Sequence, residues 1–114
     1  MKLTPIYSDC YVITEAEGLD PIGVQLHDFE RGKGRLVVEC YGQAWAAYWL
    51  GMGGMRLREF IASADADYIA ICLQRDSMRR PSKRGMEYLT RIVEAMKSAL
   101  KQLDFQSPHE GPSA

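Results

Sequence analysis

The apolar residues of this chain change their spacing once, and this change constrains the fold more than any other sequence feature. Ile22, Val24 and Leu26 alternate with polar or small residues, which is the period of a half-buried strand. Towards the C-terminus, apolar residues recur every three or four positions, which is the period of a helix packed on one face. Strands followed by helices, without βαβ alternation, predict the α+β class.

Three antiparallel strands are predicted in the first 41 residues. The first covers residues 6–14, where β-branched and aromatic side chains suit a pleated surface. The second covers residues 22–26 and the third residues 35–41. Residues 31–34 join them as a four-residue hairpin loop, because its glycines can take positive φ.

Three to four helices are predicted to pack against this sheet. The first ends at Gly51, because aromatic residues recur at helical spacing in an alanine-rich stretch that starts after Gly42. The second covers residues 56–62, and the third covers residues 66–74 and buries Tyr68. The last helix has an apolar stripe formed by Leu89, Ile92, Met96, Leu100 and Leu103.

The 114 residues suit one domain, which we place at residues 1–104. Residues 105–114 have almost nothing to bury, so we expect a disordered tail. No apolar run approaches the ~20 residues of a membrane span, and the N-terminus lacks the apolar segment of a signal peptide. We therefore expect a protein of the host cell cytoplasm.

Its three cysteines, which are odd in number and far apart, are expected to be reduced and buried: Cys10, Cys40 and Cys72.

Neither metal ligands nor a catalytic constellation emerges from the residue pattern. The cysteines are too widely spaced for a zinc site, and the chain has two histidines, one of them in the expected tail. His27 lies on the polar phase of a strand and is interpreted as a surface residue rather than as a base for Cys10 or Cys40. We predict a non-enzymatic protein without metal or cofactor.

Two further segments have structural explanations that we prefer to functional ones. Asp65 and Asp67 lie where a loop meets a helix, and helix capping accounts for carboxylates there. Residues 51–54, followed by Arg56 and Arg58, are similar to a glycine-rich anion cradle. However, the Lys-Ser/Thr of a nucleotide loop is missing and a helix is expected before the segment, so a tight helix–helix turn is the better interpretation.

Positive charge is concentrated in the second part of the chain. Residues 1–30 hold one cation against six acids, whereas residues 31–103 hold thirteen cations against seven acids. The densest group occurs in residues 75–84 and contains a single acid. Such a segment suits phosphates or an acidic protein patch, or it is only a solvated loop. We name its five cations the basic segment: Arg75, Arg79, Arg80, Lys83 and Arg84.

Tyr48 and Trp49 form the second candidate binding feature. Adjacent rings on a helix point about 100° apart, so both cannot face one narrow core. One ring is expected at the surface, where tyrosine and tryptophan commonly anchor protein interfaces. We expect homodimerisation through this aromatic stretch or through the last helix.

A resemblance to small phage- and prophage-encoded proteins rests mainly on the motif Glu-Cys-Tyr-Gly-x-Ala-Trp-x-x-Tyr-Trp at residues 39–49. The similarity continues at residues 59–60 and 65–70, and more weakly at residues 88–93, and it covers about half of the chain. It implies a small protein carried by a mobile element, of the kind that binds a host component, and it transfers no catalytic residue.

We therefore expect an accessory protein that binds a host protein or a nucleic-acid-handling complex, including a defence system such as CRISPR interference. The basic segment would supply charge, and Tyr48 or Trp49 would supply the anchor. The alternative is a module that binds nucleic acid directly through the same cations.

Overall fold

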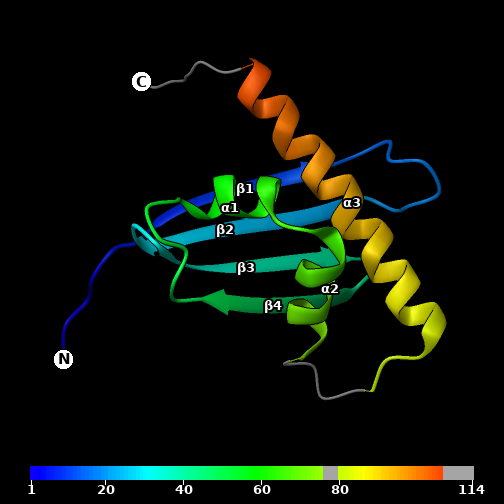
Figure 1. Ribbon diagram of the computed structural model, residues 1–114, viewed down its shortest axis with the longest axis horizontal. Coiled ribbons are helices and arrows are strands. Elements are labelled where there is room, and N and C mark those ends of the chain that lie inside the picture. The colour runs from blue at the N-terminus through cyan, green and yellow to red at the C-terminus, as the bar shows by residue number, and fades with distance from the viewer. Residues whose placement is uncertain (76–79, 107–114) are drawn as a thin grey trace.

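The computed structural model describes residues 1–75 and 80–106. Within them, four strands precede three helices, which confirms the predicted α+β class. The strands form one antiparallel sheet in the order β1-β2-β3-β4 (Figure 1). The elements are β1 (Tyr7–Ile13), β2 (Ile22–Glu30), β3 (Lys33–Cys40), β4 (Gln43–Trp49), α1 (Leu57–Ser63), α2 (Ala66–Arg75) and α3 (Lys83–Gln106).

The sheet has four strands instead of the predicted three, because the aromatic stretch predicted as the first helix is β4. Trp45, Ala47 and Trp49 are all buried and alternate with more exposed residues, as a strand with one covered face requires. Tyr41 and Gly42 connect β3 to β4 with positive φ angles of 52° and 77°, the signs that a two-residue hairpin turn of type I′ needs. The hairpin between β2 and β3 is also shorter than predicted, because Lys33 already pairs with Glu30.

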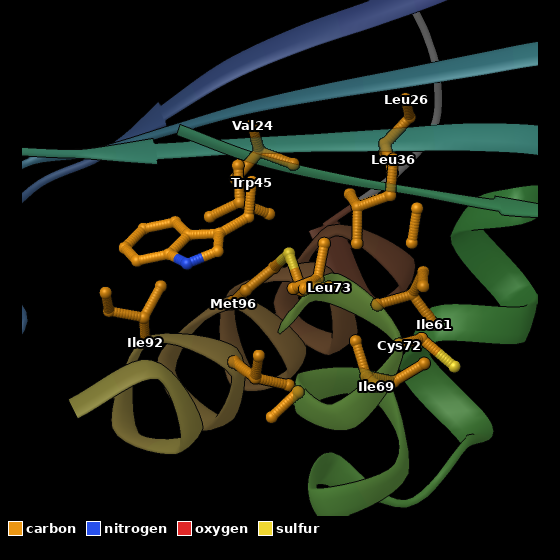
Figure 2. Close-up of a cluster of buried hydrophobic side chains, with 14 of the residues drawn as sticks. Val24, Leu26, Leu36, Trp45, Ile61, Ile69, Cys72, Leu73, Ile92 and Met96 are labelled. Atoms are coloured by element: carbon orange, nitrogen blue, oxygen red, sulfur yellow. The ribbon is translucent and has the colours of Figure 1, made fainter. Parts of the chain in front are cut away.

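All three helices lie on one face of the sheet, so the molecule has two layers (Figure 1). The core fills the space between them. Figure 2 shows Val24, Leu26, Leu36 and Trp45 projecting from the strands towards Ile61, Ile69, Leu73, Ile92 and Met96 of the helices, and all of these side chains are buried. The apolar stripe predicted for the last helix is confirmed, since Leu89, Ile92, Met96 and Leu100 are buried.

The connection from β4 to α1 is held against the β2–β3 turn. Gly32 donates a backbone hydrogen bond to Met55 and accepts one from Met52, with N···O distances of 3.1 Å and 2.9 Å. Arg31 Nη1 donates to the carbonyl of Gly54 at 2.8 Å. The predicted helix–helix turn at residues 51–54 is thus wrong, because a strand and not a helix precedes it.

A side chain of α3 also forms hydrogen bonds with α1. Lys97 of α3 donates hydrogen bonds to the carbonyl groups of Ile61, Ala62 and Ala64. These carbonyl groups lie at the C-terminal end of α1, whose last turn contains no basic residue that could bind them. Burial lowers the pKa of the Lys97 ammonium, and Lys101 acts in the same direction. Helix α3 continues to Gln106, so residues 105 and 106 of the predicted tail are helical, and the rest of that tail, residues 107–114, lies outside the described residues.

Candidate interaction surfaces

The basic segment lies where α2 ends and α3 begins. Arg75 is the last residue of α2, while Arg80, Lys83 and Arg84 lie before and within the first turn of α3, and all four are exposed. Arg79 lies outside the described residues. Ser82 caps α3, because its Oγ accepts the N–H of Gly85 at 2.9 Å. The fold therefore holds several cations at one end of the helical layer.

The cations at the start of α3 are unfavourable for the helix itself. The N-terminus of a helix carries a partial positive charge, so lysine or arginine in the first turn costs about 0.3–1 kcal/mol. Helix α3 has no acidic residue in its first turn, whereas Lys83 and Arg84 both lie there. Helix stability therefore does not account for these two cations.

A shallow groove of about 870 Å³ adjoins these cations between α2 and α3. Its apolar centre includes Ile71 of α2, which is 58% exposed, and Met86 of α3. Charged side chains of both signs also line the groove, and Lys83 belongs both to this lining and to the basic segment. The remaining lining residues are Asp67, Glu87, Thr90 and Arg91.

Ile71 is the residue of this surface that sequence reasoning missed. The buried face of α2 contains Ile69, Cys72 and Leu73, which are spaced three and four residues apart. Ile71 falls outside that set, so helical periodicity alone would have identified it as an exposed apolar residue. Tyr68, predicted to be buried on this helix, is also exposed.

Tyr48 and Trp49 occupy opposite faces of the sheet, because neighbouring residues of a strand point in opposite directions. Tyr48 is 48% exposed on the face without helices, so the prediction of one surface ring is confirmed. Trp49 is only 7% exposed, and its Nε1 donates to the hydroxyl of Tyr68 at 3.1 Å. Its ring centroid lies 5.4 Å from that of Phe60, so Trp49 is a core residue.

Tyr48 belongs to a cluster on the uncovered face of the sheet. Its ring stacks on Phe29 with 6.2 Å between centroids, and the Arg35 guanidinium lies 5.7 Å from each ring centroid. Arg35 Nη1 also donates to the Tyr48 hydroxyl at 3.2 Å. The structure thus places Tyr48 and the basic segment in different layers and does not bring them together.

The residues weighed for catalysis are dispersed. His27 is opposite Ser8 and Arg35, whereas Cys10 pairs with Gln25 and Cys40 with Ile22, so neither thiol is the cross-strand partner of His27. Burial, together with the Arg35 charge, lowers the pKa of the His27 imidazole. All three cysteines are free, but Cys10 is exposed, which corrects the prediction that every cysteine is buried.

The aspartate pair lies at the start of α2 as predicted. The carbonyl of Asp65 accepts the N–H of Ile69 at 3.1 Å, the bond that an N-cap residue makes, and Asp67 lies in the first helical turn. Within residues 1–75 and 80–106, no three histidine, cysteine or acidic side chains gather into a group that would hold a metal ion. No helix among these residues is both long and apolar enough to cross a bilayer.

A four-stranded antiparallel sheet with helices on one face defines a small α+β protein. The model of a family described as a phage family, Phage_phiTE_072, matches residues 1–87. The chain belongs to this phage family. The match includes the whole sheet, α1 and α2, and it ends just after the first turn of α3. No curated protein and no solved structure matches the chain.

Proposed function

We propose that this phage protein is a non-enzymatic accessory protein that binds a host protein complex in the host cytoplasm and blocks it by covering a functional surface. Complexes that handle nucleic acid, including defence systems such as CRISPR interference, are the targets we propose. The binding site is the groove between α2 and α3 together with the adjacent cations. The observation that supports it best is the exposed apolar side chain of Ile71 beside cations that destabilise their own helix.

The composition of this surface is that of a protein interface. Such interfaces have an apolar centre that becomes fully buried, surrounded by a polar rim that stays accessible to solvent. Ile71 and Met86 supply the centre, and the rim carries both charge signs through Lys83, Asp67 and Glu87. Mixed charges suit a protein partner with complementary charges better than a uniformly negative phosphate backbone.

The first experiment is affinity capture of the tagged protein from lysate of its bacterial host, with nuclease, followed by reconstitution from the purified partner. The test variant is Lys83→Gln/Arg84→Gln, which we expect to be about 0.6–2 kcal/mol more stable than the natural protein, because it removes two cations from a helix N-terminus. We expect this variant to bind the purified partner at least about fivefold more weakly.

The control variant, Lys2→Gln/Lys101→Gln, removes the same amount of charge from exposed positions outside the proposed site. It should retain the affinity of the natural protein. Equal weakening in both variants would show that only net charge matters and would contradict the proposed site. Unfolding in urea, measured for all three proteins, separates weaker binding from loss of fold.

Direct binding of nucleic acid is the second candidate function, because Arg75, Arg80, Lys83 and Arg84 are all exposed at one end of the helical layer. The dependence of affinity on salt distinguishes it. Neutralising several phosphates would make the logarithm of the binding constant fall steeply and linearly with the logarithm of salt concentration. If the captured material is lost on nuclease treatment and its binding constant depends on salt in this way, the second candidate function replaces the first.

A further inference from the structure

The strand β4 has one side on which no further strand of the described residues pairs with it. It is the last strand of the sheet and pairs only with β3 (Figure 1). Cys40 and Gln43 close the two-residue turn, so hydrogen-bonded pairs recur at every second residue from Gln43 onwards. The N–H and C=O groups of the intervening residues therefore point away from β3. These residues are Ala44, Ala46 and Tyr48.

Edge strands of natural sheets usually carry a charge, a proline or a bulge that discourages pairing with another chain. The seven residues of β4 contain no charged residue and no proline, and their register with β3 is unbroken. The opposite edge differs. In β1, Asp9 lies on the core face opposite Leu26, and Pro5 precedes the strand. Among the described residues, β4 is the edge strand without a charge, a proline or a bulge, so its backbone can pair with another strand.

We propose that β4 pairs antiparallel with β4 of a second copy of this chain, around a two-fold axis at Ala46, to form one continuous eight-stranded sheet. This homodimer is independent of the proposed function, since it uses the sheet edge and not the groove between α2 and α3. The free backbone groups match in this register. Ala46 pairs with Ala46 of the second copy, and Ala44 pairs with Tyr48 of the second copy.

The side chains of β4 are self-complementary in the same register. On the core face, Trp45 lies opposite Ala47 of the second copy, and on the uncovered face Tyr48 lies opposite Ala44. Each large ring thus meets a small residue. Shifting the register by two residues places Trp45 opposite either Trp49 or the second copy's own Trp45, so two large rings would compete for one space. Because the side chains of β4 are complementary to those of a second β4 in one register, a second copy of this chain is favoured over an unrelated strand as the partner of β4.

The test measures the mass of the natural protein in solution by sedimentation equilibrium, and then compares Ala46→Lys with Ala46→Glu. Residue 46 points to the uncovered face, so a longer side chain does not enter the core. Each variant places like charges directly opposite each other at the two-fold axis. We expect the natural protein to have the mass of two chains, each variant alone to show a twofold lower mass, and an equal mixture of the variants to regain the dimer.

The control is Val12→Lys on β1, whose side chain is 70% exposed at the other edge of the sheet. It should remain dimeric. A monomeric natural protein would overturn the proposal, as would dimers that persist in both Ala46 variants or that are lost in Val12→Lys. Failure of the mixture to restore the dimer, with both variants folded by circular dichroism, would show that the copies do not meet at residue 46.

Discussion

The phenol of Tyr88 donates a hydrogen bond of 3.4 Å to the Cys40 thiol, whose own sulfur donates to the carbonyl of Asp20 at 3.5 Å. This chain of hydrogen bonds joins α3, β3 and the β1–β2 connection. It favours the protonated phenol, because a phenolate has no proton to donate. The hydrogen bond to Cys40, followed by burial, raises the pKa of Tyr88 to about 12.

The raised pKa predicts how stability changes in alkali. The phenol loses its proton at its ordinary pKa of 10.0 in the unfolded chain but only at about 12 in the folded protein. Between these values the folded state binds more protons, so the free energy of unfolding decreases as the pH rises through this window, and the full contribution is present below it. In Tyr88→Phe, urea unfolding across the same pH range should show a smaller decrease.

Tyr41→Phe is the matched control, because Tyr41 is 81% exposed in the β3–β4 turn. It should show the same alkaline decrease as the natural protein. In absorbance titration, the phenolate step at about pH 12 should be present in Tyr41→Phe and absent in Tyr88→Phe. If that step persists in Tyr88→Phe, it belongs to another tyrosine, such as Tyr11, whose pKa is also raised by burial.

At the scale of the elements, the contact between the β2–β3 turn and the β4–α1 connection depends on glycine at one position. Gly32 has φ of +87°, and a Cβ placed there would clash with the carbonyl oxygen of Gly53. Gly53 also has positive φ, at +67°, but a Cβ there would meet nothing within 4 Å. The two positions share the backbone penalty for alanine, and only Gly32 adds a steric clash with backbone.

We therefore predict different costs for two matched substitutions. Gly53→Ala should lower the free energy of unfolding by about 1–2 kcal/mol, the cost of a left-handed conformation in a residue with a Cβ. Gly32→Ala should lower it by about 3 kcal/mol or more, because the turn and the connection must also separate. Equal costs, measured by urea unfolding, would show that close approach of the two segments contributes nothing to stability.

Local sequence patterns predicted most elements but not β4, and the reason is physical. The spacing of Trp45, Ala47 and Trp49 is that of a strand with one buried face. However, alanine is the best helix former, so the alanines between the two tryptophans favour a helix in a prediction from sequence. The sequence also does not indicate the turn before β4. Tyr41 takes the positive φ that in such a turn is usually taken by Asn or Asp. Here tertiary packing against α2 outweighs helix propensity.

The sequence predicted one part of the candidate site, the basic segment, but not the other part, the groove. Runs of charge are visible in a sequence, so the basic segment could be found without a structure. The groove could not, because its walls come from α2 and α3, and only the packing of these helices brings Ile71 next to Met86 and Lys83. Likewise, the basic segment and one ring of Tyr48 or Trp49 were expected to act together, whereas the fold places Tyr48 on the uncovered face of the sheet and Trp49 in the core.

At the scale of the whole molecule, the fold gives two faces of different character. The helical face has the groove and the basic segment, while the sheet face has the stacked pair Phe29 and Tyr48. The acidic first 30 residues form β1, β2 and the connection between them, whereas most cations belong to the later elements. An uneven charge distribution of this kind orients an approaching partner.

The proposal that the helical face binds the host partner is the central claim, and one comparison of affinities tests it directly. Ile71→Glu changes the centre of the groove and Tyr48→Glu changes the sheet face, with the same added charge and at similarly exposed positions. Against the purified partner, we predict that Ile71→Glu weakens binding about tenfold or more, while Tyr48→Glu binds as the natural protein does. Loss of binding in Tyr48→Glu with unchanged affinity in Ile71→Glu would contradict this claim and assign the partner to the uncovered face of the sheet.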